Sequence, residues 1–476
     1  MNFSDFKLSS EILKTIKMLG YKNPTEVQEK TIPLVLEGKD IIVKSQTGSG
    51  KTASFGIPLC EKVKLENKKP QALILTPTRE LAVQIKEDIS NIGRFKKVKC
   101  TAVYGKEPIS IQKNQLKQRV HIVVGTPGRT FDHIRKGNLD LSDIKYLIID
   151  EADKMLNMGF IDQVEDIIKE ITNDRITMLF SATLEERIEK LCKRYMNHPE
   201  KIEISKKNVT TDIIEQEYYK VDHSKRFNTL TKVIYAEVPD SAIIFCNTKV
   251  EVGNVANKMR NKGFNVNALH GGMDQKDRLY TINDFKRGKF QFLVATDVAA
   301  RGIDVEEITH VINYEVPVEK ESYVHRIGRT GRAGHKGKSI TFVSDYEKRM
   351  FNEIEEYIGY SVIEKEIPND EEVEKGKKLF EEKTRQRPKF KKAKSHEIDK
   401  KITKLHINAG KKKKVRAGDI VGAINNIPGI TSEDIGIIDV QDAFSYVDIL
   451  GNKGNIVLKN LDTIKGKKVR VQLAKN

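Results

Sequence analysis

The chain has 476 residues, of which 38% are hydrophobic and 32% charged, and its formal net charge is +17. This composition excludes collagen-like and strongly disordered chains, and the length suffices for about three domains of ~100–200 residues. A cationic surplus of this size favours an anionic partner, most often nucleic acid.

The spacing of the cysteines and the length of the apolar runs indicate the cellular compartment in which the protein works. Cys60, Cys100, Cys192 and Cys246 lie far apart and form no C-x-x-C pair, so neither a structural metal site nor a disulfide framework is predicted. Reduced, mostly buried thiols are the simplest interpretation. No apolar run approaches the ~20 residues needed to span a bilayer, and the N-terminus does not resemble a signal peptide. The sequence therefore predicts a cytoplasmic protein with no membrane partner.

Short apolar runs alternate with helix-like stretches up to about residue 360. The first series is DIIVKS, ALILTP, HIVVGTP, YLIIDEAD and MLFSAT, and the second is SAIIFCNT, FNVNALHGG, FQFLVATD, HVINYEVP and KSITFVSD. Continuous Val/Ile/Leu runs separated by helices predict parallel strands covered on both faces. We expect two α/β units, 1–205 and 210–367, joined by the linker KKNVTTD.

The composition changes after the second unit. Residues 368–400 are dense in charge and poor in apolar residues, which predicts a charged linker that mixes a solvated helix with a flexible segment. Alternating apolar residues return from Lys401, so residues 401–476 are expected to form a small α+β unit.

The stretch SQTGSGKT, residues 45–52, follows a predicted strand and precedes a predicted helix. Glycines there let the backbone fold around phosphates, Lys51 would reach the β- and γ-phosphates, and Thr52 would hold magnesium. The pattern alone could arise by chance, but its strand–loop–helix context favours a nucleotide site. Ser45 replaces the usual Gly or Ala. The predicted phosphate-binding residues are Gln46, Thr47, Gly48, Ser49, Gly50, Lys51 and Thr52.

Carboxylates follow another apolar run, YLIIDEAD at 146–153. The carboxyl end of such a strand lies beside the P-loop. Asp150 would hold Mg²⁺ directly or through water, and Glu151 would orient and deprotonate the attacking water. A surface acidic cluster is the alternative, which the preceding apolar strand disfavours.

These stretches resemble the motifs of the DEAD-box RNA helicases, a family named after the sequence at 150–153. The resemblance covers nearly all of residues 1–367 and implies two tandem RecA-like domains, ATP and Mg²⁺ as cofactors, and RNA as partner. The further motifs, in family order, are GYKNPTEVQ (20–28) with Phe3 upstream, PTRELAVQ (77–84), TPGR (126–129), SAT (181–183), IIFCNT (243–248), LHGGMDQKDR (269–278), VATDVAARGID (294–304) and HRIGRTGR (325–332).

The resemblance also implies roles at the nucleotide. Gln28 would read the adenine edge and Tyr21 would stack on the base; a buried amide that pairs with adenine mismatches guanine, which favours ATP over GTP. Asp304 would hold the ribose. Arg329 and Arg332 would act as arginine fingers supplied by the second unit, so the site is complete only when the two units close.

Coupling and RNA contacts are implied in the same way. Ser181 and Thr183 would relay between the ATP and RNA sites, with a simple strand-end cap as the alternative. Contacts to the RNA backbone and 2′-OH groups would be RNA-selective but largely independent of base sequence. The family often has paired glycines where this chain has Gly105 and Lys106. The implied RNA contacts are Thr78, Arg79, Thr126, Gly128 and Arg129 in the first unit and Gly271, Arg278 and Thr296 in the second.

The third unit has the order β-α-β-β-α-β, typical of an RRM-like fold. Its predicted strands are LHINAG, IGIIDV, AFSYVDIL and KVRVQL. Phe444 and Tyr446 share one strand face, where an RNP1 signature has aromatics, but Asp442 and Ala443 replace its basic residue and glycine. These aromatics would either stack on RNA or pack on the linker or a neighbouring domain.

A DEAD-box core followed by GKKKKVRAGDIVGAI and a small RRM-like domain resembles the bacterial DbpA subfamily, which includes the YxiN proteins. The resemblance implies that the domain binds a hairpin of large-subunit ribosomal RNA within a pre-ribosomal particle. A solvated tail is the alternative, but the flanking two-residue alternation favours a loop of a folded domain. The basic residues assigned to the reading surface are Lys411, Lys412, Lys413, Lys414 and Arg416.

Together these patterns predict an ATP-hydrolysing RNA helicase that locally unwinds or remodels structured RNA, with large-subunit ribosomal RNA during ribosome assembly as its target. An ATP-gated RNA clamp or assembly platform without productive unwinding is the alternative, and a DNA helicase is a weaker one. The predicted catalytic residues are Lys51, Asp150, Glu151, Arg329 and Arg332. The presence of Glu151, Ser181, Thr183 and both arginine fingers favours turnover.

Overall fold

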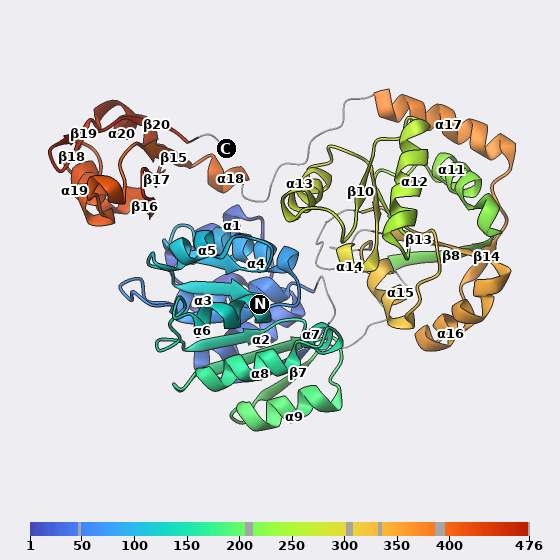
Figure 1. Cartoon of the computed structure of the whole chain (residues 1–476), viewed down its shortest axis with the longest axis horizontal. Helices are drawn as coiled ribbons and strands as arrows, with labels where there is room; N and C mark the ends of the chain where they lie inside the picture. The colour runs from blue at the N-terminus through green and yellow to red at the C-terminus, as the bar shows by residue number, and fades with distance from the viewer. Residues whose placement is uncertain (46–48, 205–212, 301–307, 332–335, 386–395, 475–476) are drawn as a thin grey trace. The chain divides into compact units, whose positions relative to one another are not determined.

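The computed structural model describes residues 1–45, 49–204, 213–300, 308–331, 336–385 and 396–474 (Figure 1). The chain forms two compact units, Met1–Ile204 with Ala393–Asn476, and Ser205–Lys392. The predicted linker at 206–212 lies outside the described residues.

The N-terminal domain is built on a parallel sheet of seven strands in the order β3-β4-β2-β5-β6-β1-β7. The five predicted strands are confirmed, while β3 and β7 were not predicted because one is a short CTAV stretch and the other, EKIE, is mostly charged. Both lie at the edges of the sheet, where an apolar run is not required. The strands are β1 (Ile41–Lys44), β2 (Ala72–Leu75), β3 (Cys100–Val103), β4 (Ile122–Gly125), β5 (Tyr146–Ile149), β6 (Ile176–Ser181) and β7 (Glu200–Glu203).

Helices cover both faces of this sheet, as the continuous apolar strands require. In β2, Ala72 and Ile74 face a core shared with α2, α3 and α4, whereas Leu73 and Leu75 face a second core shared with α7, α8 and α9. The helices are η1 (Phe3–Phe6), α1 (Ser10–Met18), α2 (Glu26–Glu37), α3 (Lys51–Lys62), α4 (Arg79–Ile92), α5 (Ile109–Leu116), α6 (Pro127–Arg135), α7 (Ala152–Asn157), α8 (Ile161–Glu170) and α9 (Glu186–Tyr195).

The second α/β domain repeats this architecture with the strand order β10-β11-β9-β12-β13-β8-β14, again entirely parallel. The strand β8, IEQEYYK, was missed because its polar and charged residues obscure its apolar ones. The strands are β8 (Ile214–Lys220), β9 (Ala242–Phe245), β10 (Val266–Leu269), β11 (Phe292–Ala295), β12 (His310–Asn313), β13 (Gly337–Val343) and β14 (Ile363–Lys365).

Two groups of helices cover the second sheet, α11 and α12 on one core and α13, α15 and α16 on others. Together with the strands they give the predicted fold class of two tandem RecA-like domains. The helices up to residue 358 are η2 (His223–Lys225), α11 (Arg226–Glu237), α12 (Lys249–Asn261), α13 (Gln275–Lys286), α14 (Asp297–Ala300), α15 (Lys320–Ile327), η3 (Asp345–Glu347) and α16 (Lys348–Ile358).

Helix α17 (Asp370–Arg385) lies within the predicted charged linker at 368–400 and covers about half of it. It packs on α11 rather than standing free in solvent. Phe380 is buried against Tyr235, Phe264 and Phe292, and Lys383 donates to the Val238 carbonyl at 3.1 Å. Most of α17 is exposed, as expected of a solvated helix, but Phe380 anchors it to the domain, which its composition did not indicate.

The C-terminal domain has an antiparallel sheet in the order β16-β17-β15-β20, with two main helices, which confirms the predicted β-α-β-β-α-β order. A small hairpin of β18 and β19 was not predicted. The elements are α18 (His396–Asp399), β15 (Ile402–Ile407), η4 (Lys411–Lys413), α19 (Ala417–Asn425), η5 (Ser432–Asp434), β16 (Ile435–Val440), β17 (Ser445–Leu450), α20 (Gly454–Asn460), β18 (Thr463–Ile464), β19 (Lys467–Lys468) and β20 (Val471–Leu473).

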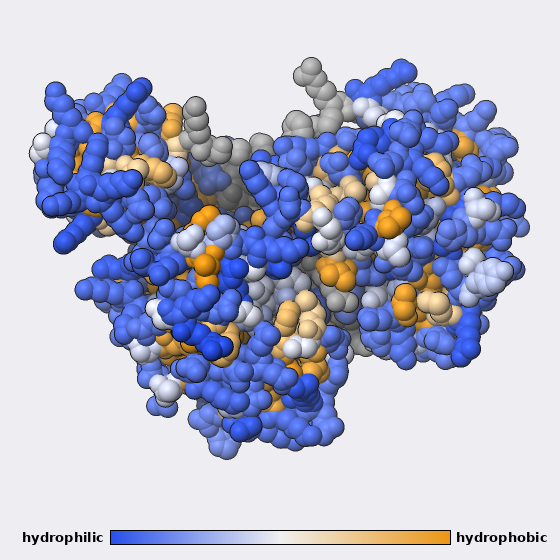
Figure 2. All heavy atoms as spheres, viewed as in Figure 1, coloured by the Kyte–Doolittle hydropathy of each residue, from blue (hydrophilic) through white to orange (hydrophobic). Residues whose placement is uncertain are grey.

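The face shown in Figure 2 is mainly hydrophilic, with small separate hydrophobic spots. All four cysteines are buried and unpaired with one another, and burial raises the pKa of the Cys100 thiol to about 12. In the described part of the chain, no helix is both long and apolar enough to cross a membrane.

Candidate ATP and RNA site

The phosphate-binding loop lies between β1 and α3, at the carboxyl edge of the first sheet. Gly50 has φ +92°, a left-handed conformation that favours glycine, and a Cβ there would lie 2.6 Å from Nε2 of Gln28. The loop therefore requires glycine at this position. Ser49, Lys51 and Thr52 are described, whereas Gln46, Thr47 and Gly48 lie outside the described residues.

The predicted adenine-reading segment is bonded directly to this loop. Gln28 Nε2 donates to the Gly50 carbonyl at 3.2 Å, and Thr25 Oγ1 donates to the Ser49 carbonyl at 2.9 Å. Gln28 Oε1 accepts from the Thr25 amide at 3.0 Å, which fixes the orientation of its amide. Tyr21 stacks on Phe3 with ring centroids 6.2 Å apart, so both aromatic residues of the motif lie together.

Three motifs meet at the ends of β1, β5 and β6. The Ser45 amide donates to the Ser181 carbonyl at 3.0 Å, and Lys51 Nζ donates to the Ser45 carbonyl at 3.1 Å. The Ser181 hydroxyl accepts from the Asp153 amide at 3.2 Å and donates to the Thr183 carbonyl at 2.6 Å. The SAT segment thus contacts both the P-loop and the DEAD segment.

The carboxylate pair is enclosed. Burial raises the pKa of Asp150 to about 6, with Lys51 opposing the shift and the Glu151 carboxylate adding to it. Asp150 Oδ1 is buried and has no hydrogen-bond partner among the described residues. An oxygen in this state beside a P-loop suits a hard divalent cation such as Mg²⁺. Glu151, at φ +56°, precedes α7, and its Oε1 lies 2.7 Å from Lys154 Nζ.

The implied RNA contacts of the first domain lie after neighbouring strands. Thr78 precedes α4 and its hydroxyl accepts from the Leu81 amide at 3.3 Å, while Thr126 precedes α6 after β4. Because β3, β4 and β2 are adjacent and parallel, the loops that follow them share one edge of the sheet. Arg129 Nη1 donates to the Glu107 carbonyl at 2.8 Å, so α6 is bonded to the loop after β3.

The departure from paired glycines lies in this loop. A Cβ at Gly105 would lie 3.4 Å from the Arg79 guanidinium, so the two residues are close. Lys106 has φ +62° and an exposed side chain. The main chain therefore keeps a conformation that favours glycine although the residue is lysine. Gly128, beside this loop in α6, is exposed.

The implied contacts of the second domain are only partly exposed. Gly271 and Thr296 follow β10 and β11, which are adjacent, and the Thr296 amide donates to the Leu269 carbonyl at 3.3 Å. Gly271 is exposed, whereas Arg278 in α13 is only 9% exposed, so most of its side chain lies inside the domain.

The arginine-rich segment HRIGRTGR also contains Arg326, a buried arginine that was not among the predicted site residues. Arg326 is 1% exposed and donates to both carboxylate oxygens of Asp297, each at 2.6 Å, and to Asn247 Oδ1 at 2.8 Å. It therefore orients α15 against α14 and the end of β9. The sequence feature that could have indicated this ion pair is the presence of a third arginine in HRIGRTGR together with an aspartate in VATD.

Of the predicted arginine fingers, Arg329 is described and Arg332 is not, and Asp304 also lies outside the described residues. Arg329 is 5% exposed, and its Nε donates to the His325 carbonyl at 3.2 Å. This hydrogen bond fixes the position of the Arg329 side chain just after the end of α15.

The lysine run is a folded loop between β15 and α19. The amides of Lys411 and Lys412 donate to the carbonyls of Gln441 and Asp442 at 2.9 and 2.8 Å. Lys411, Lys412, Lys414 and Arg416 have exposed side chains, whereas Lys413 is partly buried. The alternative of a solvated tail is therefore wrong, because the loop is hydrogen-bonded to the segment that precedes β17.

An aromatic cluster lies on the sheet of the same domain. His406, which was not predicted, packs with Phe444 and Tyr446 at centroid distances of 5.1 and 5.5 Å, and Lys404 Nζ lies 5.1 Å from the centre of the Tyr446 ring. The cluster forms because His406 on β15 and Tyr446 on β17 are directly opposite each other in the antiparallel strand pair.

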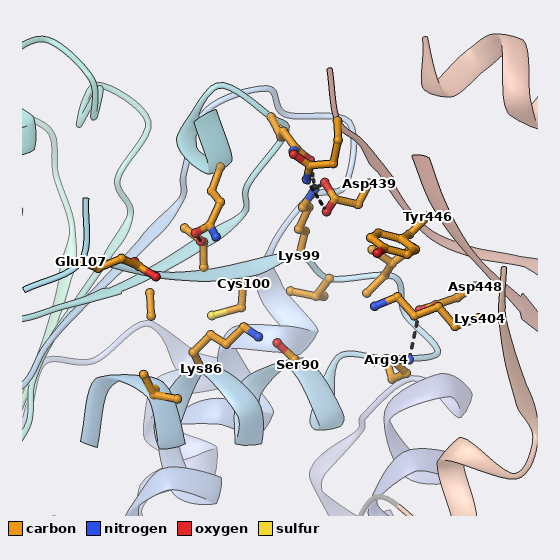
Figure 3. Close-up of a pocket in the computed structure, with 18 of the residues that line it drawn as sticks. Lys86, Ser90, Arg94, Lys99, Cys100, Glu107, Lys404, Asp439, Tyr446 and Asp448 are labelled. Carbon is orange, nitrogen blue, oxygen red and sulfur yellow. Dashed lines mark hydrogen bonds and ion pairs between the residues drawn. The ribbon is translucent and has the colours of Figure 1, made fainter. Parts of the chain in front are cut away.

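The first unit also contains a pocket lined by residues of α4, β3 and the C-terminal sheet (Figure 3). Two ion pairs border it, Lys99–Asp439 at 3.1 Å and Arg94–Asp448 at 3.2 Å. Tyr446 lines this pocket, so one of the aromatics faces residues of the N-terminal domain.

This fold and this site define a P-loop ATPase built from two RecA-like domains. Family models match in three places: DEAD/DEAH box helicase over residues 25–191, helicase conserved C-terminal domain over residues 225–334, and DbpA RNA binding domain over residues 404–473. The chain is 56% identical over 475 residues to the ATP-dependent RNA helicase DbpA of Bacillus subtilis (strain 168), covering 99% of both chains. It belongs to the DEAD-box ATP-dependent RNA helicases, in the bacterial DbpA subfamily, and it is an ATP-hydrolysing, RNA-binding enzyme.

Other relatives match the core. The DEAD-box ATP-dependent RNA helicase CshA of Bacillus subtilis (strain 168) is 44% identical over 356 residues, which are 75% of this chain and 72% of that one. Among solved structures, S. cerevisiae Dbp5 bound to RNA and ADP BeF3 has a TM-score of 0.71 at 32% identity, covering 80% of this chain and 99% of that one. Mss116p bound to ssRNA and AMP-PNP has a TM-score of 0.69 at 29% identity, covering 79% and 81%.

Proposed function

We propose that the protein remodels large-subunit ribosomal RNA within a pre-ribosomal particle in the cytoplasm. The C-terminal domain selects a ribosomal RNA hairpin, and the core unwinds short duplexes near it without reading their sequence. The observation that carries this proposal is the folded, exposed lysine loop after β15, in a domain that matches the DbpA RNA binding domain. A tether raises the effective concentration of the core near the selected RNA.

In the core, Lys51 binds the β- and γ-phosphates, and Gln28 and Tyr21 hold the adenine. Glu151 accepts a proton from the attacking water, and its ion pair with Lys154 holds the buried carboxylate in one direction. Asp150 and Thr52 would hold Mg²⁺, which when bound neutralises charge on the phosphates. Arg329, and Arg332 beyond the described residues, stabilise charge that develops on the γ-phosphate.

The proposed relay uses the contacts of Ser181. Because Ser181 touches both the P-loop and the DEAD segment, a change at the phosphates reaches the SAT segment and Thr183. RNA is held through Thr78, Arg79, Thr126, Gly128 and Arg129 in the first domain. Gly271, Arg278 and Thr296 complete the set in the second.

The test is RNA-stimulated ATPase activity at fixed salt, because electrostatic binding alone depends steeply on salt. A ribosomal RNA fragment that contains hairpins is compared with generic RNA. The variant replaces Lys411, Lys412 and Lys414 with Gln, and a control of equal charge change replaces the exposed Lys375, Lys377 and Lys378 of α17. A chain ending at residue 385 keeps α17 and removes the C-terminal domain.

The loop variant and the shortened chain should lose the preference for the ribosomal fragment and keep weak activity on generic RNA at high concentration. The α17 control should keep the preference. If the shortened chain retains the full preference, the C-terminal domain does not select the RNA. If only the loop variant retains it, the domain selects the RNA through another surface, such as that of His406, Phe444 and Tyr446.

A further inference from the structure

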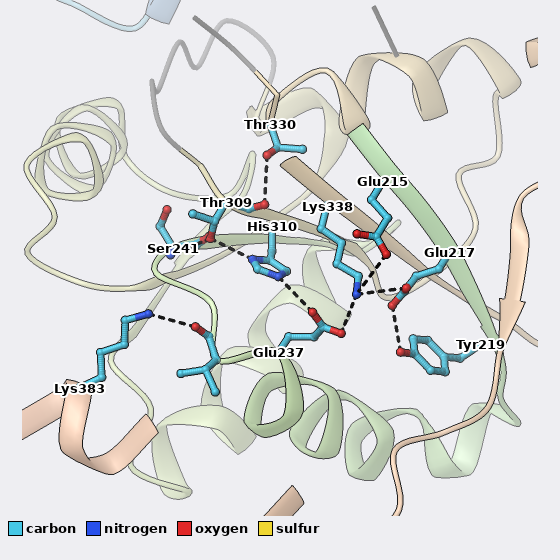
Figure 4. Close-up of polar contacts among 11 residues, drawn as sticks. Glu215, Glu217, Tyr219, Glu237, Ser241, Thr309, His310, Thr330, Lys338 and Lys383 are labelled. Atoms are coloured by element: carbon cyan, nitrogen blue, oxygen red, sulfur yellow. Dashed lines mark hydrogen bonds and ion pairs between the residues drawn. The ribbon is translucent and has the colours of Figure 1, made fainter. Parts of the chain in front are cut away.

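Thr330 is the residue that follows Arg329 in the loop after α15, and it is 2% exposed. Its hydroxyl donates to the main-chain carbonyl of Ile308, and the Thr309 carbonyl lies 3.2 Å from the same oxygen (Figure 4). Both carbonyls belong to the segment that leads into β12. A single side-chain hydroxyl thus attaches the arginine-bearing loop to the start of a central strand.

The segment that accepts this bond is itself fixed. Thr309 Oγ1 donates to the Ser241 carbonyl at 2.8 Å and accepts from the Ser241 amide at 3.3 Å. His310 Nδ1 lies 2.9 Å from Thr309 Oγ1. Because the one hydroxyl proton of Thr309 goes to Ser241, His310 Nδ1 is the donor in this contact. The starts of β9 and β12 are therefore tied together directly beneath Thr330.

Charged side chains continue the network into three further elements. His310 Nε2 lies 3.6 Å from Glu237 at the end of α11, and Lys338 Nζ on β13 lies 2.7 Å from Glu237 and 3.1 Å from Glu217 on β8 (Figure 4). Glu217 is 1% exposed and also accepts from the Tyr219 hydroxyl at 2.9 Å. Buried charges in such a network hold their elements in one arrangement.

Two glycines, Gly331 and Gly337, pack tightly around Thr330. A Cβ at Gly337 would lie 2.2 Å from Thr330 Oγ1 and 2.5 Å from the Gly331 nitrogen. Gly331 has φ +66°, and a Cβ there would lie 2.5 Å from Ile214 Cγ1. Gly337 therefore lies so close to the Thr330 hydroxyl that a larger residue there would collide with it.

We infer that Thr330 is a positioning residue for ATP hydrolysis: its hydroxyl anchors the loop to β12 so that the Arg329 guanidinium is held where charge develops on the γ-phosphate. This inference rests on the proposed role of Arg329 as an arginine finger. A guanidinium displaced by ~1 Å loses much of its effect on the transition state, and such misplacement costs up to ~10²-fold in rate.

The experiment compares kcat, the KM for ATP and RNA affinity in the full chain. Thr330→Val removes the hydroxyl at constant shape, Thr330→Ser keeps it, and Arg329→Ala tests the finger itself. Thr231→Val is the matched control, since it removes a hydroxyl that donates to the Phe227 carbonyl in α11 of the same domain. Thermal melting is recorded for every variant, and Thr330→Cys, with a weakly donating thiol, replaces Thr330→Val if that variant does not fold.

The inference predicts that kcat falls ~10- to 100-fold in Thr330→Val. The KM for ATP and the RNA affinity should stay within about twofold, and Thr330→Ser should stay within about threefold of the parent kcat. Thr231→Val should keep its kcat. If Arg329→Ala loses turnover and Thr330→Val does not, the positioning role is overturned while the proposed finger stands. If Arg329→Ala keeps normal turnover, the finger and the positioning role are both wrong.

Discussion

Glu151 and Lys154 form an ion pair of 2.7 Å in which the two side chains are only 8% and 6% exposed. They lie one helical turn apart at the start of α7, directly after the strand that carries Asp150. Because the Glu151 carboxylate is buried, little water has to be removed from it when a substrate binds. The ion pair also fixes its orientation.

Replacing Glu151 with Gln should lower ATP turnover by ~10²–10⁴-fold and leave ATP binding intact, because an amide keeps the shape but does not accept the proton. Removing one charge of a buried pair also lowers stability, by up to ~3–5 kcal/mol. The double variant Glu151→Gln, Lys154→Met should regain stability without regaining turnover. Calorimetric melting and ATPase assays check both halves. Near-normal turnover in either variant would show that Glu151 is not the base.

Lys106→Gly should raise stability and weaken RNA binding at the same time. A left-handed lysine costs roughly 1–2 kcal/mol, which glycine relieves, while the exposed amino group is lost from the edge that carries Thr78 and Arg129. Lys7, at φ 54° and exposed, is a matched control. Both glycine variants should melt higher, and only Lys106→Gly should bind RNA with a smaller salt dependence. Equal RNA binding by the two variants would place Lys106 outside the interface.

Gly376→Ala should release α17 from α11. A Cβ there would lie 1.9 Å from the Tyr235 carbonyl oxygen, which is main chain and does not yield. Exposure of Phe380 then costs about 1.5–3 kcal/mol, and amide exchange in 370–385 should rise. Gly253→Ala in α12 is the control, because its Cβ would meet nothing within 4 Å and alanine favours the helix. Unchanged exchange in α17 would contradict the packing described.

Glu237 makes the second domain sensitive to acid. Burial acts to raise its pKa, but the contacts with His310 and Lys338 outweigh it and lower the pKa to about 2, from 4.5. Because the folded pKa lies below the unfolded one, this stabilisation is complete above about pH 4.5 and is lost as pH falls towards 2. The protection of amides in α11 and β13, corrected for the intrinsic pH dependence of exchange, should therefore fall below pH 4.5, and Glu237→Gln should flatten this dependence. A parent profile that is equally flat would contradict the assignment.

Much of the fold was predictable because buried parallel strands require uninterrupted apolar residues. DIIVK, YLII and IIF therefore appear directly as β1, β5 and β9. The charged strands β7 and β8 gave no such signal. The attachment of helix α17 to the domain was not predictable for a related reason, since local composition reports its many charges and not the one phenylalanine that decides its packing.

The motifs predicted that Lys51 and Asp150 lie near each other, and the structure brings the Lys51 charge close enough to Asp150 to oppose the rise in its pKa. Other contacts made between motifs were not predictable, because they depend on which segments the fold brings together. Arg326 and Thr330 stand within a predicted motif, yet their partners at Asp297 and Ile308 lie elsewhere in the chain. The left-handed conformation of Lys106 likewise has no signature in the sequence.

The most direct test of the account is a strand-displacement assay with duplex in excess over protein. The substrate is a short duplex beside a ribosomal RNA hairpin, and the readout is the number of strands released per protein molecule. With ATP, the account predicts many strands released per molecule by the full chain and no more than about one by Glu151→Gln. Steady ATP hydrolysis by the full chain with no strand release would contradict it and identify an ATP-gated clamp instead.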